Sequence, residues 1–353
     1  MREKVKALWK LCFDDSEEFV EMYFRLRYNN KVNIAIESGD KVIAALQMLP
    51  YPMTFCGSEV PTAYVSGACT HPDHRNRGVM NRLLSEAFGR MYHNGTFFST
   101  LIPAEPWLFG YYARTGYATA FRYEKRTYRL PKEEIDASPS ASENEEFQSF
   151  TDYNEEAYHY LNRKMHERSC CLQHTDADFR VLLADLKLSG GAIFTLSDEC
   201  GVRALAVAYP DVSPAVSHTV PPVVFHIGEL FSDTPETEHA LLTHICKSME
   251  VESLNIITPC TDRHTGFDLG MIRIIQALPV LRLYAAAHPE EKLDIALTDE
   301  YLPVNNGYYR LAEGQCTYHR TPLPEQPHEQ LTIGQLAIKL FPTEQTYMSL
   351  MLN

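Results

Sequence analysis

The sequence predicts a mixed α/β protein with two tandem mixed-sheet units of similar element order, followed by a small α+β unit. Three observations predict this fold class. Helical and strand-like patterns alternate over the first 130 residues, a similar order of patterns returns after residue 150, and new strand patterns begin near residue 290. At 353 residues the chain is also longer than one core usually supports. We expect domains at 1–132, 133–286 and 287–353.

The first unit is predicted to begin with two helices and to continue as a sheet with further helices. Apolar residues recur at helical spacing over 5–13 and 16–28. The strand-like runs are 32–38, 41–55, 63–70, 96–103 and 118–130, and the helical patterns between them are 78–93 and 107–115. The central part is therefore expected to alternate strand, helix, strand, helix, strand.

The second unit repeats this order after a linker. Residues 131–147 are rich in proline, serine and acidic residues and lack apolar periodicity, which predicts a domain boundary. Beyond it, GVRALAVAYP (201–210) corresponds to KVIAALQMLP, and VVFHIGELFS (223–232) corresponds to AYVSGACTHP. A helical pattern over 236–249 and a strand over 253–259 complete the match. We interpret this as an internal duplication.

The last segment has its own strands and one helix. Strands are predicted over 293–300, 308–313 and 315–320, with a turn at 305–307 and a helix over 331–341. The chain ends in the apolar stretch TYMSLMLN. This ending fits a buried terminus, and it fits equally an ordinary strand packed on a core.

Composition and charge exclude several classes of protein. The net charge of -14 disfavours a nucleic-acid surface, which needs clustered lysine and arginine. No apolar run approaches the ~20 residues of a membrane span, and the charged N-terminus is unlike a signal peptide. Nine cysteines without CxxC spacing suit reduced thiols. We therefore expect a cytoplasmic protein with no nucleic-acid or membrane partner.

The stretch HPDHRNRGVM (71–80) predicts an anion-binding turn. It joins a strand to a helix, so the main-chain N–H groups of Asn76 to Met80 lie at a helix start, where they lack helical partners. Gly78 allows close approach, and Arg75 and Arg77 add positive charge. A lone R-x-x-G is more often only a turn and a cap, but P-x-x-R before it and Y-x-R-x-G-Y at 112–117 favour a pyrophosphate cradle. The second unit has the acidic SDTPETEHA at this place, so we expect it to be structural.

Residues 70–80 resemble the coenzyme A loop of the GNAT (Gcn5-related) N-acetyltransferases, and Met80 departs from the glycine or alanine of most members. With Y-x-R-x-G-Y, the duplicated unit and the last segment, the chain resembles the enhanced intracellular survival (Eis) type. Members of that type join an active GNAT domain, a degenerate GNAT-like domain and a sterol-carrier-protein-like domain. The last segment here is shorter than the family norm.

The resemblance implies acetyl-CoA as co-substrate and no metal. It assigns the pantetheine arm to main-chain groups of Ala68, Cys69 and Thr70. The residues it implies for the phosphates are Arg75, Asn76, Arg77, Gly78, Val79, Met80 and Asn81. It makes Tyr112 the general acid that protonates the departing thiolate, and the α-carboxylate of Asn353 the general base.

Several alternatives stay open. The alternative interpretation of Tyr112 is a core aromatic residue. His71 and His74 have no third ligand nearby in sequence, so we expect loop or rim residues instead of a metal site. The expected function is acetyl transfer from acetyl-CoA to a primary amine of a small molecule or peptide by direct attack. A non-catalytic acetyl-CoA-binding regulator and a lipid-binding protein acting through the last domain are the alternatives. The resemblance also suggests a homo-oligomer.

Overall fold

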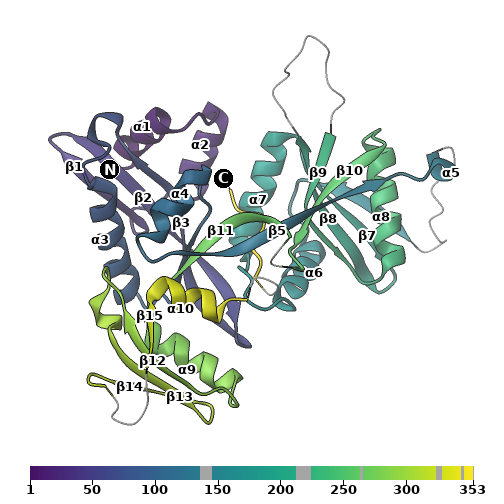
Figure 1. The fold of residues 1–353 in the computed structure, drawn as a ribbon. Helices are drawn as coiled ribbons and strands as arrows, with labels where there is room; N and C mark the ends of the chain where they lie inside the picture. The colour runs from purple at the N-terminus through teal and green to yellow at the C-terminus, as the bar shows by residue number, and fades with distance from the viewer. Residues whose placement is uncertain (136–144, 212–223, 263–264, 323–327, 343–345, 353) are drawn as a thin grey trace.

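The computed structural model describes the chain except residues 136–144, 212–223, 263–264, 323–327, 343–345 and 353. Figure 1 shows two lobes connected by long strands, with a smaller unit below the first lobe. Among the described residues, eleven strands form one sheet in the order β1-β2-β3-β4-β11-β5-β10-β9-β8-β7-β6, and four form a second sheet in the order β14-β13-β12-β15. The predicted fold class is confirmed.

The first unit is a sheet with helices on both faces. Its elements are α1 (Arg2–Cys12), α2 (Glu17–Leu26), β1 (Asn33–Ser38), β2 (Lys41–Phe55), β3 (Ser58–Thr70), α3 (Val79–His93), β4 (Phe98–Leu101), α4 (Pro106–Ala113) and β5 (Ala118–Arg129). Alternate side chains of β2 divide the core between the two faces. Leu46 and Met48 belong to the cluster that contains α3, whereas Leu49 and Tyr51 belong to the cluster that contains α1 and α2. Alternation in the sequence thus sets which face each helix covers.

The second unit repeats this architecture. Its elements are α5 (Lys132–Ile135), β6 (Glu146–Phe150), α6 (Glu155–His166), α7 (Asp176–Ser189), β7 (Ala192–Asp198), β8 (Gly201–Asp211), β9 (Val224–Ser232), α8 (Pro235–Ser248), β10 (Ser253–Pro259) and β11 (Phe267–Ile274). The elements β8, β9, α8 and β10 correspond in order to β2, β3, α3 and β4, as the duplication predicted. The predicted linker is wrong at its end, because β6 begins at Glu146 and pairs with β7.

Each unit contributes one strand to the sheet of the other unit. This exchange was not predicted from the sequence. The strand β11 pairs antiparallel with β4 of the first unit, and β5 pairs antiparallel with β10 of the second. Figure 1 shows both strands crossing between the lobes. The strands of the first and second units therefore form one continuous sheet. The predicted domain boundaries mark positions along the chain and do not separate this sheet into two.

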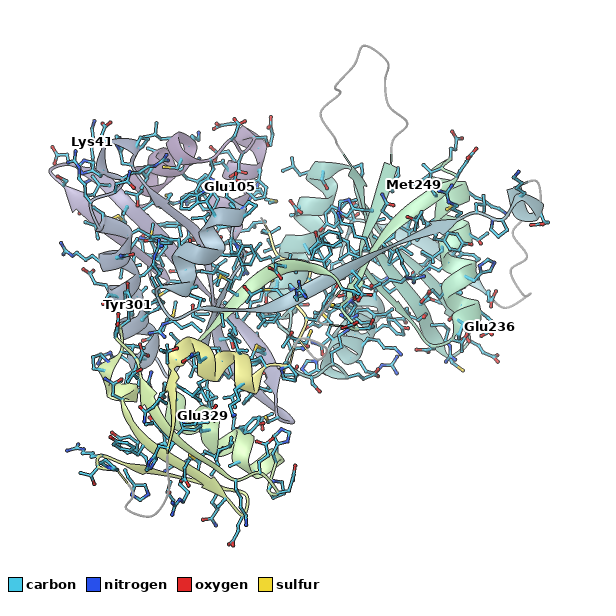
Figure 2. The ribbon with its side chains drawn as sticks, in the orientation of Figure 1. Lys41, Glu105, Glu236, Met249, Tyr301 and Glu329 are labelled. Carbon is cyan, nitrogen blue, oxygen red and sulfur yellow. The ribbon has the colours of Figure 1, made fainter. Side chains whose placement is uncertain are left out.

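The third unit contains α9 (Ala277–Ala287), β12 (Leu293–Thr298), β13 (Gly307–Ala312), β14 (Gln315–His319), β15 (Glu329–Thr332) and α10 (Ile333–Leu340). A buried ion pair attaches it to β11, the strand that pairs with β4 of the first unit. The Arg273 guanidinium of β11 donates to Asp299 at 2.7 Å and lies 4.4 Å from the centre of the Phe88 ring of α3. Tyr301, which lies beside α3 in Figure 2, packs its ring on Phe88. A pair that is buried on both sides fixes this orientation, because separating it leaves a buried charge unpaired.

No helix among the described residues has the length and apolar character needed to cross a bilayer.

Candidate active site

The sheet of the first unit opens beside the predicted cofactor strand. The strands β3 and β4 pair in parallel from Thr62 and Phe98 to Tyr64 and Thr100. Beyond Tyr64, β3 continues to Thr70 with β2 on one side and no described strand on the other. On this side the main-chain groups of β3 beyond Tyr64 have no strand partner among the described residues, and the predicted pantetheine contacts Ala68, Cys69 and Thr70 lie in this stretch.

A β-bulge in β3 sits at the start of this open edge. Ser66 pairs with Gln47 and Cys69 pairs with Ala45, so Gly67 and Ala68 together face one residue of β2. Gly67 has φ +59°, and a Cβ there would lie 2.1 Å from a carbon of the Trp9 ring. Glycine is therefore required at this position. The bulge was not predicted, although a glycine inside a strand pattern is a recognised signal for one.

The N-terminus of α3 is uncapped. Asn76 and Gly78 both have left-handed backbone, with φ 59° and 73°. Gly78 is the N-cap residue, and its helix has neither a side-chain cap nor an acidic residue in the first turn. Among the described residues, no group accepts a hydrogen bond from the main-chain N–H groups of residues 77–80. These donors and the helix dipole favour an anion at this exposed turn.

The N-terminus of the corresponding helix in the second unit, α8, is capped. The Thr234 hydroxyl accepts from the N–H of Thr237 and the Thr237 hydroxyl accepts from the N–H of Thr234, which forms a capping box. Glu236 and Glu238 place negative charge in the first turn of α8, and Figure 2 shows Glu236 at the start of this helix. The contrast supports the prediction that one unit alone carries an anion site.

The predicted loop residues gather at the end of β3. Arg75 donates from Nε to the main-chain oxygen of Thr70 at 3.2 Å. Asn81 accepts a 2.7 Å hydrogen bond from the Tyr111 hydroxyl, which connects α3 to α4. The Thr70 hydroxyl is buried and has no described partner. An unpaired hydroxyl and unpaired amides can bind a ligand that carries phosphate and amide groups. Val79 and Met80, by contrast, pack partly into the cluster around α3, and Arg77 is exposed.

His71 and His74 do not assemble a metal site. The Nδ1 atom of His71 accepts a hydrogen bond from the N–H of Asp73 at 3.3 Å, and so caps the short 3-10 helix Pro72–His74. The described residues contain no cluster of three or more potential metal ligands.

Cys12 lies against the same strand end. Its thiol donates to the main-chain oxygen of Thr70 at 3.5 Å. A hydrogen bond with Cys69 and the nearby Arg75 lower the pKa of Cys12 to about 7, despite partial burial. The pKa of the buried Cys69 is raised by the same hydrogen bond and by burial. The site therefore has a thiol of lowered pKa beside the predicted path of the cofactor, which spacing alone did not reveal.

Tyr112 is buried on α4, and its hydroxyl has no described hydrogen-bond partner. Burial raises its pKa, and neighbouring Tyr111 and Cys69 raise it further. The phenol is therefore protonated at neutral pH and lies near the predicted pantetheine strand. Tyr117, by contrast, forms a 2.7 Å hydrogen bond with Ser99 and is a core residue.

The C-terminal tail leaves the third unit and is anchored between the first two. The N–H of Tyr347 donates to Cys170 at 3.2 Å, and the Ser349 hydroxyl donates to the buried Glu229 at 2.6 Å. His174 bonds the Ser349 main-chain oxygen at 3.0 Å. Residues 351 and 352 pack partly against the core of the first unit. Asn353, the predicted general base, lies outside the described residues.

The anchoring groups are themselves fixed by charge. Arg168 donates two hydrogen bonds of 2.8 Å to the Glu229 carboxylate, which is 1% exposed. Burial lowers the pKa of His174, which favours its neutral form. None of these anchors was predicted, because they come from segments far apart in the sequence.

Residues 2–120 match the family model of the acetyltransferase (GNAT) domain. The N-terminal unit is therefore similar to a GNAT domain. It contains the open edge of β3, the uncapped start of α3 and Tyr112. The remainder of the chain is outside this match, and no curated protein matches the sequence significantly.

Solved structures share the fold of the whole chain. A GCN5-related N-acetyltransferase from Anabaena variabilis has 16% identity and a TM-score of 0.76, with 98% of this chain and 96% of that chain covered. A GCN5-related N-acetyltransferase from Kribbella flavida has 16% identity and a TM-score of 0.70, covering 99% and 95%. Eis1 from Mycobacterium abscessus has 14% identity and a TM-score of 0.69, covering 96% and 86%. The GNAT domain and its two companion units therefore form a known arrangement, and the Eis type and the sterol-carrier-like domain remain predictions.

Proposed function

We propose that the protein transfers an acetyl group from acetyl-CoA to a primary amine. The proposal depends on one observation: the N-terminal unit has two sets of main-chain groups without hydrogen-bond partners, and both lie at the predicted cofactor site. The free edge of β3 after Gly67 suits the amide-bearing pantetheine arm, and the uncapped amides of residues 77–80 suit the pyrophosphate. The capped start of α8 lacks this second surface.

In the proposed reaction the amine nitrogen attacks the thioester carbonyl directly. A carbon–nitrogen bond forms, the carbon–sulfur bond breaks, and the Tyr112 phenol gives its proton to the departing sulfur. A base takes the proton that the amine loses. The α-carboxylate of Asn353 is our candidate, because the family resemblance implies it and residues 351 and 352 pack partly against the core of the first unit. The site then works mainly by orientation and proton transfer.

A panel of primary amines with acetyl-CoA, read by release of free thiol, tests the proposal. We expect amine-dependent thiol release in the wild-type protein and a large loss in a variant extended beyond Asn353. Binding of coenzyme A without thiol release for any amine would favour a non-catalytic binding protein.

A further inference from the structure

A cavity of about 410 Å³ lies where the two halves of the large sheet meet. Ile102, directly after β4, lines one part of it, and Gly228 of β9 lines another. The tail residues 347–351 form part of the wall. The main chain of Ile102 hydrogen-bonds the Tyr64 phenol, and Tyr64 is where β3 and β4 stop pairing. The cavity therefore lies between the end of β4 in the N-terminal unit and β9 of the second unit.

Asp185 of α7 is the one acidic residue among the described residues that line this cavity, and no lysine or arginine lines it. No hydrogen bond or ion pair to its carboxylate is found in the described part of the chain. Glu229 is close by in sequence to the lining residue Gly228, but it is paired with Arg168. Burial raises the pKa of Asp185 to about 6. At neutral pH the cavity wall thus carries a negative charge that no described cation balances.

Aromatic rings line the same cavity as this carboxylate. Tyr209 and His226 stack with ring centres 5.3 Å apart and planes at 10°, and both line the cavity. Burial, with a further contribution from Asp185, raises the pKa of Tyr209, so the carboxylate lies near that ring. Phe19 and Tyr123 also line the cavity. A single carboxylate among aromatic rings favours an organic cation, because ion pairing and the ring faces both attract it.

We propose that Asp185 binds a second cationic group of the acceptor, so that the acceptor is an amine with an apolar body and two separated ammonium groups. The inference rests on the proposed function. One ammonium group is held at Asp185, and the other amine lies toward Ile102 and the open edge of β3, where it is acetylated. Asp185 is thus a residue that determines which amine is used.

Calorimetry in the absence of acetyl-CoA tests the cation site by itself. The probes are α,ω-alkanediamines of increasing length and alkyl monoamines of matched length, titrated at about pH 8, where a carboxyl group with a pKa near 6 is ionised. We expect the wild-type protein to bind a diamine of suitable length about tenfold to a hundredfold more tightly than its monoamine. Asp185→Asn should remove this preference. The matched control is Asp152→Asn, which removes one negative charge from an exposed side chain.

Equal binding of diamine and monoamine by the wild-type protein, or equal preference in the Asp185→Asn and Asp152→Asn variants, would overturn the inference. The melting temperature at pH 8 gives a second readout, because removing an unpaired, partly buried charge should raise it for Asp185→Asn and not for Asp152→Asn. An unchanged or lower melting temperature would also count against an unpaired carboxylate. Failure of the proposed function would look different: diamines would bind at Asp185, yet no amine would release thiol from acetyl-CoA.

Discussion

Ser349 donates a 2.6 Å hydrogen bond to the carboxylate of Glu229, which holds the C-terminal tail against the second unit. The bond joins residues 120 positions apart in the chain. It determines where the tail runs after Ser349, because the same residue's main-chain oxygen is bonded to His174.

Ser349→Ala should therefore loosen the tail without unfolding the protein. Glu229 keeps both hydrogen bonds from Arg168, so we expect a loss of about 1 kcal/mol in the free energy of unfolding. The rate of acetyl transfer should fall while the affinity for coenzyme A stays unchanged. Ser248→Ala is the control, because Ser248 bonds the partly exposed His244 far from the tail. An unchanged transfer rate in Ser349→Ala would show that the tail has no part in the reaction.

Lowering the pH should weaken the attachment of the tail at His174, which is hydrogen-bonded to the main-chain oxygen of Ser349. Burial is the main cause of its lowered pKa; Asp178 and Glu229 oppose the shift, whereas Arg27 adds to it. The unfolded chain, with an ordinary imidazole pKa of about 6.5, then binds more protons than the folded chain. Stability is therefore fully present above that value and falls as the pH drops below it.

Urea unfolding at about pH 8 and about pH 5 measures this dependence. We expect His174→Gln to reduce the loss of stability on acidification, and His93→Gln, which changes an exposed residue, to leave it as in the wild type. Equal pH dependence in the two variants would contradict the assignment.

Tyr112→Phe should lower kcat by about 10²- to 10⁴-fold, because the phenol is the proposed proton donor to the thiolate. Stability should change little, since the hydroxyl has no described partner. Tyr117→Phe loses the hydrogen bond to Ser99, and so should cost stability and leave kcat nearly unchanged. Steady-state kinetics and thermal unfolding of the two variants separate these effects. A Tyr112→Phe enzyme of full activity would assign the proton transfer to another group.

Cys12 should be the reactive thiol of the GNAT domain. Its alkylation rate should rise with pH around a midpoint of about 7, and Arg75→Ala should move that midpoint upward. Coenzyme A should slow the reaction, because Cys12 contacts the main-chain oxygen of Thr70 at the open end of β3. Mass spectrometry after limited alkylation measures this, with the exposed Cys200 as the internal reference. Equal rates at Cys12 with and without coenzyme A would argue against the proposed cofactor path.

Periodicity predicted most of what is local in this fold. The apolar runs of β2 and β8 and the helical spacing of α1 and α2 allowed these elements and the duplication to be placed. The exchange of β5 and β11 was not predictable in this way. Each of these strands has a pattern that suits a neighbour in either unit, and its actual neighbours come from the other half of the chain.

The residues of the candidate site also fall into two groups: those that are contiguous in the sequence and those that come from distant segments. The loop from Arg75 to Asn81 is contiguous, so its residue types and its position before a helix were enough to predict an anion site. Asp185 and the anchors of the tail come from separate segments, and each looks ordinary in the sequence until the fold brings it to the cavity. Gly67 lies between these cases, because a glycine in a strand is a local signal that was overlooked.

The most direct test of the account is calorimetric titration of coenzyme A into the wild-type protein and into Gly78→Ala and Gly39→Ala. Both glycines have positive φ and open space where a Cβ would stand, so either substitution should cost about 1 kcal/mol of stability through backbone strain alone. We predict saturable binding by the wild type and by Gly39→Ala, and weaker binding by Gly78→Ala. No binding by the wild type, or equal affinity in the two variants, would contradict the central claim that the start of α3 holds the cofactor.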